Sequence, residues 1–235
     1  WISERKNVLS SFFYLTALLA YLRFACPPVA TARHIPFYCL SLSLFALALL
    51  SKSVACSLPV TIAILLWLKY NGLTKAKVLS LIPFLLFGLV AALHTAILER
   101  SRVGAVGQDW AFSPLDRVLV AGRALCFYPA KLIVPYPIIF IYPRWPISPI
   151  AWGEFLFPVV FLLVIAGLVG LSRGRGAGRS GRQWAAQKPW RLITAAVLFY
   201  TGIIVPALGF VNIYPMLFTS VADHYQYLAS VGILA

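Results

Sequence analysis

The chain has 235 residues, of which 61% are hydrophobic and only 11% are charged. A soluble domain is nearer half apolar and a quarter charged, so this composition excludes a soluble globular protein. An aromatic content of 14% also excludes a disordered or collagen-like chain. What remains is a multi-span membrane protein, in which a net charge of +14 indicates cationic loops at anionic headgroups rather than a nucleic-acid partner.

Uncharged apolar runs predict the membrane spans, because a helix needs about 20 largely apolar residues to cross the hydrocarbon core of a bilayer. In chain order, the predicted spans cover residues 7–23, 35–51, 53–69, 78–98, 155–172 and 192–212, and a further span begins at residue 227. The predicted fold class is therefore all-α, a polytopic transmembrane helix bundle.

The distribution of lysine and arginine predicts the orientation of these spans, since cytoplasmic loops carry an excess of both residues. Six cations fall within residues 173–191, which predicts that this loop is cytoplasmic. Residues 99–154 then form an external loop region, and all six acidic residues of the chain lie outside.

The external region is expected to contain an amphipathic helix that lies at the membrane surface. Asp116, Arg123 and Lys131 fall within an arc of about 80° on an ideal helix, although Pro129 limits how far that helix extends. The segment 135–146 that follows is rich in proline and aromatic residues. It is typical of an interfacial belt, with a binding surface as the alternative.

Two cationic groups lie at the predicted outer edge of the membrane. Arg5 and Lys6, next to Glu4, precede the first span, and Lys52 is the only charge between the second and third apolar runs. Such cations can bind the phosphate of a lipid headgroup. The alternatives are a solvated helix start for the first group and a lysine that snorkels to the interface for the second.

A third group, Asp223-His224-Tyr225-Gln226-Tyr227, lies at the start of the last apolar run. A helix would place Asp223 and Tyr227 on one face, and an imidazole can carry a proton or donate to a phosphate. The alternative is an N-cap at Asp223 with tyrosines as interfacial anchors. The four cysteines and three histidines show no metal-ligand spacing, so no metal site is predicted.

Three stretches taken together resemble a known family. They are the run from Trp1-Ile-Ser-Glu4-Arg5-Lys6-Asn7 to Arg23, the run Leu49-Leu-Ser-Lys52-Ser53 with Leu58-Pro59 after it, and the run Val221-Ala-Asp223-His-Tyr-Gln-Tyr227-Leu. Their order and spacing resemble the membrane part of bacterial tetratricopeptide-repeat (TPR) proteins, which look like relatives of the transmembrane TPR-containing O-mannosyltransferases. The resemblance covers most of the chain and is most specific in the first and last runs.

This resemblance implies a glycosyltransferase of the GT-C type, with a GT-C-like helix bundle in a bacterial inner membrane. Such enzymes move a sugar from a polyprenyl-phosphate donor to an acceptor hydroxyl, on a protein or a glycan, at the extracytoplasmic side. A carboxylate would act as base toward the acceptor, and cations would hold the departing phosphate. The resemblance implies no particular cofactor, sugar or acceptor.

Together with the charged groups described above, the resemblance predicts roles for particular residues. The phosphate-binding group would be Arg5, Lys6, Lys52, His224 and Tyr227, with Asp223 and Tyr225 in support. The paired acidic residues of the family would lie upstream of Trp1 and the repeats beyond Ala235, so Glu4 is expected to be a helper rather than the base. Two departures are His224, where relatives often have arginine, and Ser53, where they often have proline.

Two other functions fit the composition. One is a non-catalytic membrane anchor that presents TPR repeats, and the other is a transporter of a lipid-linked substrate. Charges at the span edges rather than at mid-membrane count against a transporter. The glycosyltransferase interpretation further predicts that the Asp223 group and the Arg5–Lys6 group meet around one cleft the size of a headgroup.

Overall fold

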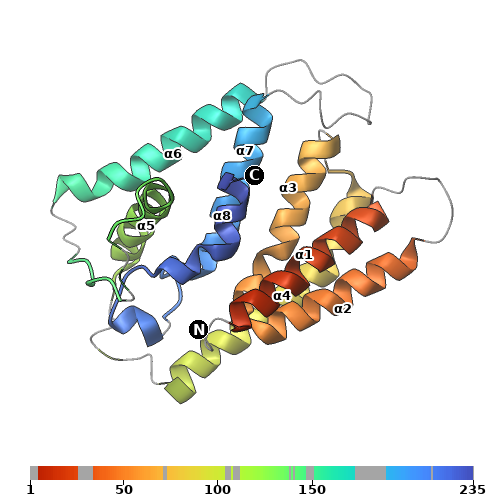
Figure 1. The fold of residues 1–235 in the computed structure, drawn as a ribbon, viewed down its shortest axis with the longest axis horizontal. Coiled ribbons are helices and arrows are strands. Elements are labelled where there is room, and N and C mark those ends of the chain that lie inside the picture. Colours follow the sequence, from red (N-terminus) through yellow and green to blue (C-terminus); the bar gives the residue numbers. More distant parts are fainter. Residues whose placement is uncertain are drawn as a thin grey trace. The chain divides into compact units, whose positions relative to one another are not determined.

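A computed structural model describes residues 5–25, 34–70, 73–103, 107, 112–137, 139, 141–146, 151–172, 189–212 and 214–234. Within these ranges the chain is helical and contains no β-strand, as the sequence predicts (Figure 1). The chain forms two compact units, Trp1–Thr95 and Ala96–Ala235. Each unit is described in turn.

The first unit contains four helices that alternate in direction. They are α1 (Arg5–Ala25), α2 (Ile35–Ser51), α3 (Leu58–Tyr70) and α4 (Lys75–Leu98), with a 3-10 turn, Ser53–Ser57, between α2 and α3. The helices α1 and α2 are antiparallel, because Ser10 Oγ donates to the Ala48 carbonyl at 3.2 Å and Ser41 Oγ donates to the Ala17 carbonyl at 2.7 Å.

Hydroxyl groups join the remaining helices of this unit. The Tyr14 hydroxyl lies 2.6 Å from Thr61 Oγ1 in α3, and the Tyr21 hydroxyl lies 2.6 Å from Ser80 Oγ in α4. The helices themselves are apolar around most of their circumference, as expected where lipid rather than water surrounds them. Interhelical hydrogen bonds and close packing, rather than an apolar stripe, therefore fix how these helices pair.

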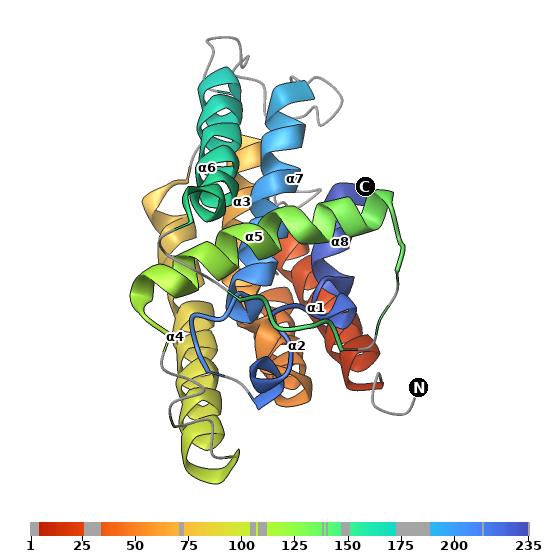
Figure 2. The same ribbon diagram turned by 90° about the vertical axis from the view of Figure 1, so that its left-hand side faces the viewer.

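The second unit is built around α5 (Pro114–Ile133), α6 (Trp152–Ser172), α7 (Pro189–Ile204) and the short α8 (Tyr227–Leu234). Irregular turns lie at 205–207, 214–217 and 223–225, and a π-helical turn, Glu99–Val103, precedes α5. Figure 2 shows α5 running across both α6 and α7. The helix α5 packs closely on α6, because a methyl group added at Gly122 would lie 2.7 Å from atoms of Pro158.

The helix α5 is the amphipathic helix expected in the external region, and it extends past Pro129. Proline has no N–H for the carbonyl four residues earlier, which here is that of Leu125. The Tyr200 hydroxyl of α7 donates to this carbonyl at 3.0 Å, so the missing backbone bond is replaced. Asp116 does not extend a polar stripe along α5, because it forms a capping box with Ser113 at the start of the helix.

Five helical segments are long and apolar enough to cross a membrane, among the residues that the structure describes. They are Arg5–Ala25, Ser53–Tyr70, Lys75–Arg102, Trp152–Ser172 and Pro189–Ala207. The helix α2 coincides with the predicted span at 35–51 but has only 17 residues. These segments are compatible with a multi-pass membrane protein.

One predicted span was too long. The run at 192–212 was expected to be helical to its end, but α7 ends at Ile204 and a 3-10 turn carries the chain to Ala207. Pro206 accounts for this change, since a proline interrupts the backbone hydrogen bonds of an α-helix. The span at 53–69 likewise begins as the 3-10 turn Ser53–Ser57 before α3.

Candidate functional site

Lys52 is held at the junction between α2 and α3. Its backbone N–H donates to the Ala48 carbonyl at 2.9 Å, which ends α2, and its backbone is extended. Its ammonium group donates to the Asn7 amide oxygen at 2.5 Å. The Lys52 ammonium is therefore fixed against the start of α1 rather than left to sample the interface.

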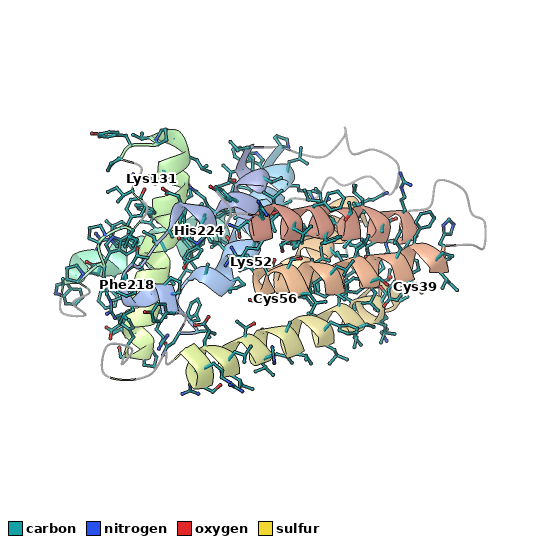
Figure 3. All side chains as sticks on the ribbon, turned by 60° about the horizontal axis from the view of Figure 1, so that its bottom comes forward. Cys39, Lys52, Cys56, Lys131, Phe218 and His224 are labelled. Carbon is teal, nitrogen blue, oxygen red and sulfur yellow. The ribbon has the colours of Figure 1, made fainter. Side chains whose placement is uncertain are left out.

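The structure brings the first two predicted cationic groups together. Arg5 and Lys6 are exposed in the first turn of α1, and Asn7, the next residue, contacts Lys52. Figure 3 shows Lys52 and Cys56 at one end of the four-helix unit and Cys39 at the other. We call Arg5, Lys6 and Lys52 the cationic end. Residues 5–95 contain no aspartate or glutamate, so no carboxylate side chain within that stretch offsets the charge of these three residues.

Packing between α1 and α2 keeps this arrangement in place. Asn7 and Ser10 lie three residues apart on one face of α1 and are both only 6% exposed. Ser10 donates to the same Ala48 carbonyl that receives the Lys52 N–H. One turn of α1 thus contacts both the backbone that ends α2 and the side chain that follows it.

The second unit places Asp223 against Tyr142. The Tyr142 hydroxyl lies 3.0 and 3.2 Å from the two carboxylate oxygens of Asp223, and it is 3.1 Å from the Pro137 carbonyl. Burial, followed by the hydrogen bond to Asp223, raises the pKa of Tyr142. The hydroxyl therefore stays protonated at neutral pH and can donate to the carboxylate.

This geometry corrects the expected helical face of Asp223 and Tyr227. Residues Asp223–Tyr225 form a 3-10 turn and α8 begins only at Tyr227, so the two side chains do not share a helix. The Asp223 carboxylate accepts from Tyr142 and orients that phenol. The prediction of a shared helical face was wrong because the chain forms a turn immediately before α8.

The other residues of this group lie close by in the turn. The His224 ring packs edge-on against Tyr225, with 4.5 Å between centroids, and Tyr227 is exposed at the start of α8. Burial, with a smaller effect from Glu99, raises the pKa of Tyr225 to about 12. The buried Tyr225 hydroxyl has no hydrogen-bond partner among the residues that the structure describes.

A cationic and aromatic face of α5 packs against the segment 141–146, which returns along this helix. Arg123 lies over the Trp145 ring at 4.5 Å and forms an ion pair with Glu154 at 3.4 Å. Lys131 lies 5.3 Å from the centroid of the Tyr142 ring. Arg123 and Lys131 do share a face, as predicted, and the face is covered by aromatic rings.

Two positions in these arrangements were not among the predicted site residues. Asn7 and Tyr142 hold Lys52 and Asp223 through contacts that link positions 45 and 81 residues apart in sequence. The signal for Asn7 was a polar amide directly before an apolar run, which the sequence alone assigns equally well to a helix start.

Some predictions lie beyond these observations. Glu4 and the basic loop after Ser172 lie outside the described residues. The Arg5–Lys6 group belongs to the first unit and the Asp223 group to the second, so their convergence stays a prediction. No cluster of three or more His, Cys, Asp or Glu side chains suited to a metal occurs in the part of the chain that the structure describes.

Comparisons of the chain with models of protein families, with curated proteins and with solved structures gave no match.

Proposed function

We propose that this chain is part of a membrane glycosyltransferase with a GT-C-like bundle, which uses a polyprenyl-phosphate sugar as its donor. The acceptor is a hydroxyl of a protein or glycan, and transfer takes place on the extracytoplasmic side of a bacterial inner membrane. The support is the resemblance of three sequence stretches together with one structural observation. That observation is the Lys52 ammonium, held by Asn7 beside Arg5 and Lys6.

The chemistry of sugar transfer matches the charge of the cationic end. An acceptor hydroxyl attacks the anomeric carbon as the bond from that carbon to the phosphate oxygen breaks, and the lipid phosphate departs with the bonding electrons. Negative charge grows on the phosphate, so a cation positioned beforehand lowers the barrier. Lys52, aided by Arg5 and Lys6, supplies this charge in our proposal.

The proton of the acceptor hydroxyl requires a base. The resemblance assigns that base to an acidic residue upstream of Trp1, with Glu4 as a helper. In the second unit, Asp223 is engaged by the Tyr142 hydroxyl and is therefore better suited to orient its neighbours than to take a proton. His224 and Tyr227 remain the proposed donors to the phosphate from this unit.

The experiment is a transfer assay with the purified full-length protein and polyprenyl-phosphate sugars. Lys52→Gln should weaken use of the donor by about 10- to 100-fold, which is the range expected when a charge-assisted contact of about 1.5–3 kcal/mol is lost. Lys52→Arg should restore only part, because a planar guanidinium presents its donors differently from an ammonium.

The other functions predict different outcomes. A membrane anchor for TPR repeats would transfer no sugar from any polyprenyl-phosphate donor, while its protein interactions would survive Lys52→Gln. A transporter would move the lipid-linked substrate between the leaflets of a vesicle without cleaving it. Transfer that is unaffected by Lys52→Gln would support the enzyme but contradict the role of the cationic end.

A further inference from the structure

We propose that Asn7 is a positioning residue that aims the Lys52 ammonium at the donor phosphate. The inference rests on the proposed function and adds to it a residue that acts through Lys52. It is carried by the 2.5 Å contact between the Asn7 amide oxygen and Lys52 Nζ, and by the burial of Asn7, which is only 6% exposed.

A lysine side chain has a flexible stem of four carbons. Fixing it in one conformation costs about 1.5–2 kcal/mol of side-chain conformational entropy. The backbone of Lys52 is already anchored, because its N–H bonds to the Ala48 carbonyl. Asn7 fixes the other end of the same side chain. Much of the ordering that phosphate binding would require is therefore complete before the donor arrives.

The chemistry of the amide suits this task. An ammonium group has three donors, and the Asn7 oxygen accepts one of them. Because the amide is neutral, it orients the ammonium without adding a negative charge beside it. Both residues of this contact lie within the first unit.

A purely structural role for Asn7 gives the opposite pattern of substitutions. If the side chain only filled space between α1 and α2, leucine would be tolerated and the longer glutamine would not. If the side chain positions Lys52, leucine removes the acceptor oxygen, whereas glutamine keeps a neutral amide oxygen. Asn7→Leu and Asn7→Gln therefore separate the two roles.

The test measures binding of a polyprenyl phosphate to the full-length protein in lipid nanodiscs. Asn7→Leu should weaken binding about tenfold, as expected for losing a contact to a charged group, while Asn7→Gln should stay within about threefold of the wild type. Ser41→Ala is the matched control, because it removes a buried hydrogen bond at the opposite end of the same helix pair. It should leave binding unchanged.

A double variant shows whether Asn7 acts through Lys52. Adding Asn7→Leu to Lys52→Gln should weaken binding no further than Lys52→Gln alone, because the group being aimed is already gone. Full additivity, or wild-type binding by Asn7→Leu, would overturn the inference. If Asn7→Leu does not fold, Asn7→Ser, whose hydroxyl is too short for the contact, replaces it in both comparisons.

The same data separate this inference from the proposed function. Loss of binding in Lys52→Gln with normal binding in Asn7→Leu would leave the donor site intact and overturn the role of Asn7 alone. Equal binding by the wild type and Lys52→Gln would overturn the donor site itself, and the positioning role with it.

Discussion

Replacing Tyr200 with phenylalanine would remove the hydroxyl that compensates for Pro129 in α5. That hydroxyl donates to the Leu125 carbonyl at 3.0 Å, and Leu125 is only 9% exposed. The carbonyl would then be buried without its helical partner, since Pro129 has no N–H. An unsatisfied buried acceptor costs about 1–3 kcal/mol, so Tyr200→Phe should lower the free energy of unfolding by that amount.

The measurement is unfolding in mixed micelles by titration with a denaturing detergent, followed by circular dichroism. Tyr225→Phe is the matched control, because its buried hydroxyl has no hydrogen-bond partner among the described residues and its removal should cost nothing. If both variants lose the same stability, or if Tyr200→Phe loses less than about 0.5 kcal/mol, the explanation for the continuity of α5 is wrong.

Two further predictions concern helix packing and topology. Gly122→Ala should destabilise the second unit by about 1–3 kcal/mol because its methyl would meet Pro158 at 2.7 Å, while Gly167→Ala, with no atom within 4 Å, should be neutral or slightly stabilising in the same unfolding assay. In a cysteine-free background, an impermeant thiol reagent outside the cell should label Gly107→Cys but not Ala177→Cys; equal labelling would contradict the predicted orientation.

The sequence predicts the helices more completely than their contacts. The apolar run at 35–51 matches α2 at both ends, because Pro36 near its start and Lys52 after its end are visible in the sequence. The helix α5 was foreseen from its polar spacing, but its continuation past Pro129 depends on Tyr200, a residue 71 positions later. Helix propensity along the sequence reflects only the local cost of placing proline in a helix, and it does not include a hydrogen bond from a distant side chain.

In the candidate site, too, the sequence indicates individual residues better than the contacts between them. Lys52 is recognisable as the only charge between two apolar runs, whereas its partner Asn7 is recognisable only once α1 and α2 are packed. The helical spacing suggested for Asp223 and Tyr227 was wrong, because local periodicity does not reveal the turn before α8. Contacts such as that of Asp223 with Tyr142 depend on tertiary packing, for which a single sequence gives little signal.

The most direct test of the account is photo-crosslinking of the full-length protein with a polyprenyl phosphate that carries a diazirine in the isoprene unit next to the phosphate. Peptide mapping should find crosslinks within residues 5–10 and 50–57, and an excess of unlabelled polyprenyl phosphate should suppress them. In Lys52→Gln, the crosslinks that the unlabelled competitor suppresses should be lost. Crosslinks that avoid both segments, or that persist unchanged in Lys52→Gln, would contradict a donor phosphate held at the cationic end.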